Sequence, residues 1–196
     1  MVKLYLTIFI CFLSLSYNTK DEEVFASIEN YLGPNINKVN ILFISIKQQE
    51  LFVIKEKSII KKFKISSSKY GTGSKSGSNK TPLGLHSIAK KIGDKTPKNG
   101  RMIGRIFNGD IATIYKDTTR SKTDDITSRI LWLKGEEKEK NQGHNIDSFN
   151  RYIYIHGTSE EGLIGQPASH GCIRLLNKDV IELYKLVSIG TLVLIL

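Results

Sequence analysis

The sequence predicts a mainly β fold, a β-sandwich or partial barrel with one C-terminal helix and a short N-terminal helix. Two observations predict it. Short runs rich in β-branched and aromatic residues recur along the chain between polar turns, as is typical of strands. Apolar residues with helical spacing occur only near the two ends, at 21–32 and 178–187, so helices do not alternate with strands as they would in a parallel α/β sheet.

The expected strands begin with an antiparallel meander. Three runs, 40–46, 51–54 and 59–65, are joined by polar turns at 47–50 and 56–58. Further strands are expected at 85–92, 102–107, 110–115, 129–133, 151–155 and 192–196.

Two polar segments, 66–80 and 135–150, predict long loops. The first is dominated by Ser, Gly and Lys, and we expect it to be mobile. Loops of this length inside a compact domain are usually functional or disordered.

Each predicted helix has an expected start. Asp21 is available as the N-cap of the first helix, which Gly33 and Pro34 end. Asn177 is expected to cap the second helix, whose apolar residues form one stripe. The stripe consists of Val180, Ile181, Leu183, Tyr184 and Val187.

The first 16 residues predict a secretory signal peptide. Lys3 supplies a positive start, the run 4–15 is apolar, and the small residues around its end favour cleavage after Ser16. An uncleaved N-terminal anchor is the alternative. Bulky residues precede Cys11, which argues against a lipid-modified cysteine.

The rest of the chain is expected to be one exported domain. Residues 17–38 predict a short helix or linker, and residues 39–196 the domain proper. No internal run approaches the roughly 20 apolar residues that a membrane-spanning helix needs. We therefore expect a monomer in the periplasm or cell wall, with no stable membrane insertion of the mature domain.

The charge balance is strongly basic, with a formal net charge of +10. Such a surplus can indicate a nucleic-acid partner. Here the lysines are scattered through turns and strand edges, and they form neither a basic helix nor a ribbon interleaved with aromatic residues. We therefore expect no nucleic-acid partner, and attraction to an anionic cell wall would be a minor benefit of the charge.

Cysteine and histidine residues gather in the C-terminal part. If the leader is removed, Cys172 is the only cysteine left, so no internal disulfide can form. A buried structural cysteine is one interpretation; a nucleophile is the other, and it would need a pKa lowered from about 8.5 to between about 3.5 and 7.5. His170 and His156 are candidate sources of that effect, and His156 at a strand end could serve as a rigidly held general base.

The glycine before the cysteine has a separate predicted use. The backbone N–H of Gly171 can face a carbonyl under attack, and together with the N–H of Cys172 it could form an oxyanion hole. A zinc site is a rival interpretation, because His144, His156, His170 and Cys172 are ligand types that zinc accepts. Their spacing fits no closed zinc pattern, and we interpret His144 and His86 as ordinary surface or packing residues.

The two C-terminal motifs resemble a known signature. Residues 155–158 (IHGT), the thirteen residues between His156 and His170, and residues 169–175 (SHGCIRL) are similar to L,D-transpeptidase (YkuD-like) catalytic domains. The similarity extends back through 81–84 (TPLG) and 126–133 (ITSRILWL), and so covers residues 39–196. The resemblance implies a YkuD-like β-sandwich or partial barrel.

The resemblance also implies a role for each motif residue. Cys172 would be the nucleophile and His156 the base, with the carbonyl of Gly157 accepting from the other imidazole nitrogen to fix the tautomer. His170 would support the site. Substrate-binding roles fall to Ser169 and to Arg174, which would place a charge near the substrate carboxylates; some family members carry Asn at this position.

The implied activity is that of a peptidoglycan L,D-transpeptidase in cell-wall biogenesis and the maintenance of cell shape. The cysteine attacks the carbonyl of the third residue of a donor stem tetrapeptide, D-Ala leaves, and an amine of a neighbouring stem resolves the thioester. No metal or organic cofactor is implied. Water as acceptor would make an L,D-carboxypeptidase, a protein amine would make a lipoprotein-attaching enzyme, and an inactive wall-binding module is the alternative from another class.

Overall fold

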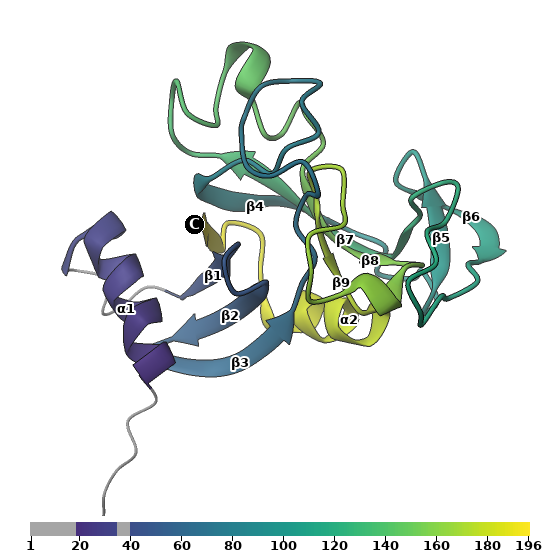
Figure 1. The fold of residues 1–196 in the computed structure, drawn as a ribbon, viewed down its shortest axis with the longest axis horizontal. Helices are drawn as coiled ribbons and strands as arrows, with labels where there is room; N and C mark the ends of the chain where they lie inside the picture. Colours follow the sequence, from purple (N-terminus) through teal and green to yellow (C-terminus); the bar gives the residue numbers. More distant parts are fainter. Residues whose placement is uncertain (1–18, 35–39) are drawn as a thin grey trace, which may run out of the picture.

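The computed structural model describes residues 19–34 and 40–196. The predicted signal peptide, its alternatives and Cys11 lie outside the described residues. Within them, ten strands form one mixed sheet, and two α-helices pack against it, α1 (Thr19–Leu32) and α2 (Asn177–Leu186) (Figure 1). The prediction of a mainly β fold with one short N-terminal and one C-terminal helix is confirmed.

The sheet is ordered β3-β2-β1-β10-β4-β7-β5-β6, and β8 branches from β7 and pairs with β9. The meander β1–β2–β3 is antiparallel, as predicted. The C-terminal strand β10 lies between β1 and β4, parallel to β1 and antiparallel to β4. The strands are β1 (Ile41–Ser45), β2 (Glu50–Lys55), β3 (Ser58–Lys64), β4 (Gly84–Ile92), β5 (Gly100–Ile103), β6 (Ile106–Ile111), β7 (Ile126–Gly135), β8 (Tyr154–Thr158), β9 (Ile173–Leu175) and β10 (Leu192–Ile195).

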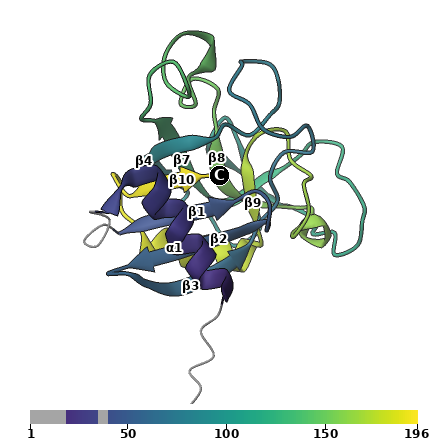
Figure 2. The same ribbon diagram turned by 60° about the vertical axis from the view of Figure 1, so that its left-hand side comes forward.

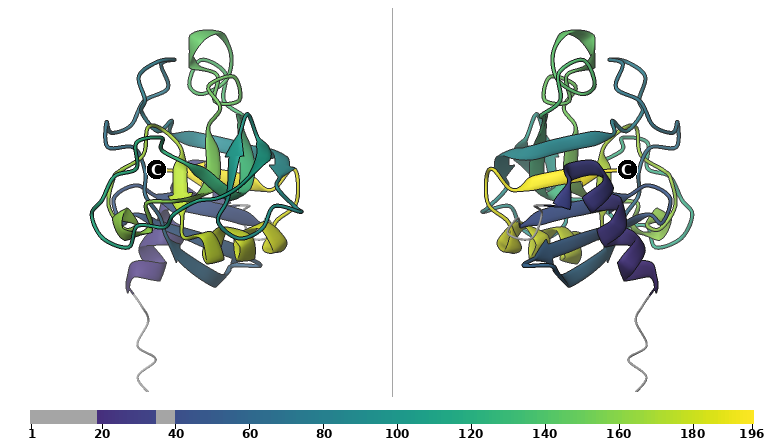
Figure 3. Two further views of the ribbon diagram at one scale, coloured as in Figure 1. Left: turned by 90° about the vertical axis from the view of Figure 1, so that its right-hand side faces the viewer. Right: turned by 90° about the vertical axis from the view of Figure 1, so that its left-hand side faces the viewer.

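The meander is buried on both faces. Successive side chains of a strand point to opposite faces, so Leu42 packs into the main core with Val180 and Leu183 of α2. Phe43, the next residue, packs into a second core that includes Ile28 of α1. Figures 2 and 3 show α1 crossing the face of the meander that is turned away from α2. This two-sided burial explains why β1 is apolar from Ile41 to Ile44 rather than alternating.

The predicted strands at 102–107 and 110–115 are wrong. Gly104 and Arg105 have φ of +56° and +70°, and they form the turn of a hairpin between β5 and β6. The Asn108-Gly109 pair, a strong hairpin signal in sequence, instead lies inside β6, where the register with β5 shifts.

The strand that carries His156 is also shifted from its prediction. Tyr152 has φ of +57°, which extended backbone does not allow, so β8 begins at Tyr154 rather than at residue 151. His156 therefore lies in the middle of β8, not at its end.

Neither helix is capped as predicted. Since α1 begins at Thr19, Asp21 lies in its first turn, where it pairs with Lys62 at 2.5 Å. Asn177 is already the first residue of α2, and its buried side chain accepts hydrogen bonds from Thr127 and Ser128 of β7.

The start of the 66–80 segment is fixed rather than mobile. Ser66, Ser67 and Ser68 are buried, and the Ser66 hydroxyl donates to the carbonyl of Leu163 at 2.7 Å. The N–H of Lys69 donates to the carbonyl of Ser169 at 3.1 Å. These contacts hold the segment beside the motif at 169–175.

In the described part of the chain, no helix has both the length and the apolar character needed to cross a membrane.

Candidate active site

Strand pairing brings the two sequence motifs together. β9 runs parallel to β8, with His156 opposite Arg174, and Cys172 immediately precedes β9. Because side chains alternate along a strand, Cys172 and Arg174 emerge on the same face as His156. These residues line a cavity of about 70 Å³ together with Asp124, Ile126, Ser169 and His170.

His156 is 2% exposed and is held in one tautomer. Its Nδ1 donates to the carbonyl of Gly157 at 2.7 Å, the contact that the resemblance implied. Nε2 is then left with its lone pair. Burial lowers the pKa of His156 to about 4, although the hydrogen bond to Gly157 opposes this shift, so the ring is neutral near pH 7 and can accept a proton.

Gly157 fits this position because it has no side chain. A Cβ added there would lie 2.6 Å from Oδ1 of Asn177 and 2.8 Å from the carbonyl oxygen of Thr127. The buried Asn177 also donates to the carbonyl of Thr158 at 2.8 Å. The side chain expected to cap α2 thus fixes the segment of β8 that carries His156.

The thiol of Cys172 is bound by backbone groups. Its Sγ donates to the carbonyl of Tyr152 and accepts from the N–H of Tyr154, both at 3.4 Å. Burial raises the pKa of the thiol to about 11, and the hydrogen bond from Tyr154 opposes the shift only in part. This contradicts the expected lowering of the pKa. At rest the group is a neutral thiol, so its proton must leave as the sulfur attacks.

The Ser169 hydroxyl makes two hydrogen bonds within the turn that contains Cys172. It donates to the carbonyl of Cys172 at 2.6 Å and accepts from the N–H of Gly171 at 3.2 Å. The N–H of Gly171 is therefore already engaged, contrary to its expected use in an oxyanion hole. Ser169 is 1% exposed but lines the cavity, and its expected substrate-binding role stays a prediction. Gly171, with φ of +124°, adopts a conformation that side chains strongly disfavour. Among the described residues we see no acceptor for the N–H of Cys172.

Arg174 does not face an open substrate surface. Its side chain is 1% exposed, with Nη1 2.7 Å from Oε2 of Glu160 and Nη2 paired with Oδ1 of Asp124. Both terminal nitrogens are occupied, and Nε is buried with no partner among residues 19–34 and 40–196. Arg174 is thus engaged in ion pairs within the protein, and its expected contact with substrate carboxylates stays a prediction.

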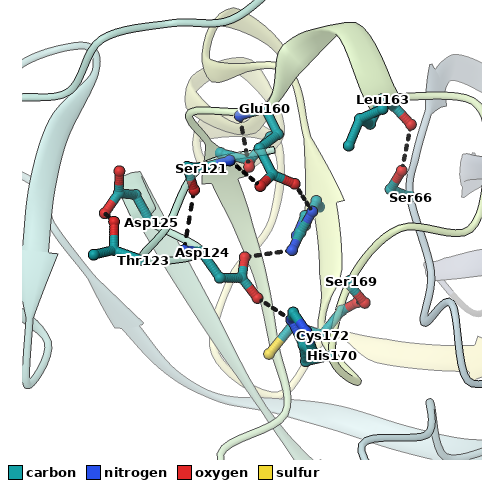
Figure 4. Close-up of polar contacts among 12 residues, drawn as sticks. Ser66, Ser121, Thr123, Asp124, Asp125, Glu160, Leu163, Ser169, His170 and Cys172 are labelled. Atoms are coloured by element: carbon teal, nitrogen blue, oxygen red, sulfur yellow. Dashed lines mark hydrogen bonds and ion pairs between the residues drawn. The ribbon is translucent and has the colours of Figure 1, made fainter. Parts of the chain in front are cut away.

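Asp124 and Glu160 are functional candidates that sequence reasoning missed. The second carboxylate oxygen of Asp124 accepts from Nδ1 of His170 at 2.6 Å (Figure 4). Both acids lie in polar stretches of the chain whose composition is typical of exposed loops. No spacing or motif marks them, because the fold alone brings them to Arg174.

The other two histidines lie apart from this cavity. His86 is buried, with Nδ1 2.9 Å from the carbonyl of Gly84 and Nε2 3.0 Å from the hydroxyl of Ser148. His144 is exposed in the 3₁₀ helix His144–Ile146. Over residues 19–34 and 40–196, no group of three or more His, Cys, Asp or Glu residues is placed to hold a metal ion.

A mixed β-sheet that brings a cysteine and a histidine at two neighbouring strands to one small cavity is the class that this geometry defines. The family model of the YkuD L,D-transpeptidase catalytic domain matches residues 39–195, so the chain belongs to this family.

Known relatives are similar over shorter stretches. A stretch of 41 residues is 56% identical to the YkuD protein of Bacillus subtilis (strain 168), covering 21% of this chain and 25% of that protein. A stretch of 45 residues is 46% identical to YqjB of the same organism, covering 23% and 26% respectively. The aligned stretches thus span about a quarter of the length of these relatives.

Solved structures share the fold. The crystal structure of an L,D-transpeptidase from Xylanimonas cellulosilytica superimposes with a TM-score of 0.51 at 19% identity, covering 83% of this chain and 63% of that one. An L,D-transpeptidase of Enterococcus faecium superimposes with a TM-score of 0.50 at 16% identity, covering 84% and 52%. At these identities the likeness concerns the fold alone.

Proposed function

We propose that this protein is a peptidoglycan L,D-transpeptidase that transfers the acyl group of a stem peptide through Cys172. The observation that carries the proposal is the shared cavity, in which Cys172 lies beside a neutral His156 whose tautomer is fixed by Gly157. Membership of the L,D-transpeptidase family supports the choice of substrate.

The first half of the reaction forms a thioester. The thiol leaves its hydrogen bond with Tyr152, its proton moves to Nε2 of His156, and the sulfur bonds to the carbonyl carbon of the third stem residue. The carbonyl oxygen becomes an oxyanion, for which the N–H of Cys172 is the available donor. The intermediate then expels D-Ala, whose amine takes the proton back from His156.

The second half resolves the thioester. An acceptor amine attacks the same carbonyl carbon and gives a proton to His156, and the thiolate of Cys172 leaves and regains a proton. Because the thiol of Cys172 is neutral at rest, it gives its proton to His156 during its attack on the stem peptide, and not in a separate ionisation beforehand. This scheme uses no metal or organic cofactor.

The acceptor and the setting are part of the same proposal. An amine of a neighbouring stem gives a cross-link, water would give an L,D-carboxypeptidase, and a protein amine would attach a lipoprotein. We propose that the domain acts as a monomer after export to the periplasm or cell wall, guided there by the leader at 1–16.

Incubation with purified muropeptides that carry tetrapeptide stems, followed by mass spectrometry, tests the proposal. We expect cross-linked dimers; tripeptides or D-amino-acid exchange products would reveal water or a free D-amino acid as acceptor. Cys172→Ala should abolish every product while leaving the protein folded. Binding of muropeptides without any turnover by the unaltered protein would contradict the proposal and favour a wall-binding module.

A further inference from the structure

A closed ring of polar contacts lies beside the cavity, and its members are Asp124, Arg174, Glu160 and Ser121. Figure 4 labels three of them, Asp124, Glu160 and Ser121. Asp124 pairs with Nη2 of Arg174, and Nη1 of Arg174 is 2.7 Å from Glu160. The N–H of Ser121 donates to Glu160 at 2.7 Å, and the hydroxyl of Ser121 accepts from the N–H of Asp124 at 3.0 Å. The ring connects three parts of the chain. Ser121 and Asp124 precede β7, Arg174 lies in β9, and Glu160 follows the end of β8.

Asp124 is the member of the ring that reaches the candidate catalytic residues. One carboxylate oxygen is bound to the buried Arg174, and the other accepts from Nδ1 of His170 at 2.6 Å. The same side chain lines the cavity with His156 and Cys172. Its φ of +47° lies in a region that few non-glycine residues adopt, and Asp is among those that tolerate it best.

The charge of Asp124 is maintained by its partners. Burial acts to raise the pKa of this carboxyl, but the Arg174 guanidinium and the hydrogen bond from His170 outweigh burial, and the pKa stays below its ordinary value. Asp124 in turn favours the protonated form of His156. The other titratable side chains that face this part of the cavity are Arg174, Glu160 and His170, with Arg151 adding a positive charge near Cys172.

We propose that Asp124 is a positioning residue for the acyl transfer. Anchored by Arg174, its carboxylate holds His170 in one orientation and places a fixed negative charge next to the imidazolium that His156 becomes when it takes the proton of Cys172. Asp124 itself neither gains nor loses a proton in this step. The inference rests on the proposed function.

The test compares two neighbouring acids in the full chain. Asp124→Asn removes the charge from the cavity, whereas Asp125→Asn makes the same change in a side chain that pairs with Arg101 at 2.8 Å instead. We expect Asp124→Asn to lower kcat/KM on tetrapeptide muropeptides about 10- to 100-fold, the loss expected for a hydrogen bond to a charged group. Asp125→Asn should leave kcat/KM nearly unchanged.

The pH profile separates positioning from a general structural defect. Asp124 raises the pKa values of both His156 and Cys172, so Asp124→Asn should move both limbs of the kcat/KM profile to lower pH. A variant that is merely less well folded would lose activity without moving the limbs. Equal rates and profiles for Asp124→Asn and Asp125→Asn would overturn the inference.

A second readout does not depend on the substrate. The pH dependence of iodoacetamide alkylation, with the product located at Cys172 by peptide mass mapping, should also move to lower pH in Asp124→Asn. If the unaltered protein does not turn over muropeptides but this shift occurs, the proposed function fails and the influence of Asp124 on the thiol stands. If Asp124→Asn does not fold, His170→Ala, at a side chain that is 41% exposed, should still lower kcat/KM, and an unchanged value would overturn the inference.

Discussion

His156 is the residue on which the chemistry of the site most depends. Positioned general bases contribute about 100- to 10,000-fold to a rate, so we expect His156→Ala to lower kcat/KM by a factor in this range. The fold should persist, because the ring of His156 lines a cavity and its side-chain hydrogen bond is made to the next residue, Gly157, rather than to another element. Muropeptide turnover and circular dichroism measure the two effects.

His144→Ala is the matched control, since His144 is exposed and lies outside the cavity. It should retain the activity of the unaltered protein. Activity of His156→Ala close to that of this control would show that another group takes the proton of Cys172.

Gly157 gives a prediction about packing. Gly157→Ala would force a Cβ against Asn177 and Thr127, and overpacking of this kind typically costs about 1 to 3 kcal/mol. Urea unfolding should show the loss. Gly104→Ala, where an added Cβ meets nothing within 4 Å although φ is +56°, measures the cost of backbone strain without a clash. A cost for Gly157→Ala no larger than for Gly104→Ala would contradict the steric account.

At the scale of single residues, the functional candidates that could be predicted are those that stand in short sequence motifs. Cys172 and His156 carry recognisable chemistry and stand in short motifs, and the structure places both in one cavity. Asp124 and Glu160 acquire their roles only through Arg174, which is 50 and 14 residues away along the chain. Burial of Arg174 and engagement of Ser169 likewise depend on tertiary contacts that residue types do not reveal.

At the scale of elements, α1 provides a prediction separate from the site. Ile28 is fully buried against β1 and β2, and α1 contributes no residue to the cavity. Ile28→Ala should lower the free energy of unfolding by about 2 to 5 kcal/mol through lost burial and the cavity left behind. Activity per folded molecule should be unchanged.

Glu29→Ala is the control for α1, because Glu29 is exposed on the same helix and its change should cost no more than about 0.5 kcal/mol. Equal stabilities of the two variants would show that α1 is not firmly packed on the meander.

The predicted strands were correct where runs of apolar residues determine the strand. They were wrong where a residue with positive φ determines where a strand begins or ends. The meander follows from its β-branched and aromatic runs. The β5–β6 hairpin could not be predicted in this way. Its turn is at Gly104 and Arg105, whereas the stronger turn signal, Asn108-Gly109, lies inside β6. The start of β8 was misplaced for the same reason, since nothing in the sequence marks the positive φ of Tyr152.

At the scale of the whole molecule, the order of strands could not be predicted from the sequence. β10 lies between β1 and β4 although it is the last strand, and β7 pairs with β4, β5 and β8. Hydrophobic patterns identify which segments are buried, but not which of several similar apolar strands become neighbours. The branch at β7 is nonetheless what brings the segment around Asp124 to β8 and β9.

Two buried neutral histidines make the stability of the whole molecule depend on pH. Burial lowers the pKa values of His86 and His156 to about 4, against 6.5 when unfolded. Between these values the unfolded chain binds more protons than the folded one, so stability rises with pH and is lost as pH falls from about 6.5 to about 4. Asp124, whose carboxyl pKa is lowered below its ordinary 3.8, adds to the loss only at still lower pH.

His86 allows this dependence to be tested away from the catalytic cavity. At 1.36 kcal/mol per pKa unit, each histidine should contribute about 2 to 3 kcal/mol of destabilisation by pH 4.5. Urea unfolding of the full chain at several pH values between 7 and 4.5 should therefore show a falling free energy of unfolding, and His86→Gln should make this fall about half as steep, whatever its stability at pH 7. His144→Gln, a change at an exposed histidine, should keep the original slope. An unchanged slope in His86→Gln would mean that His86 takes up its proton in the folded protein without opposing the fold, and that its contacts with Gly84 and Ser148 can rearrange to accommodate a charge.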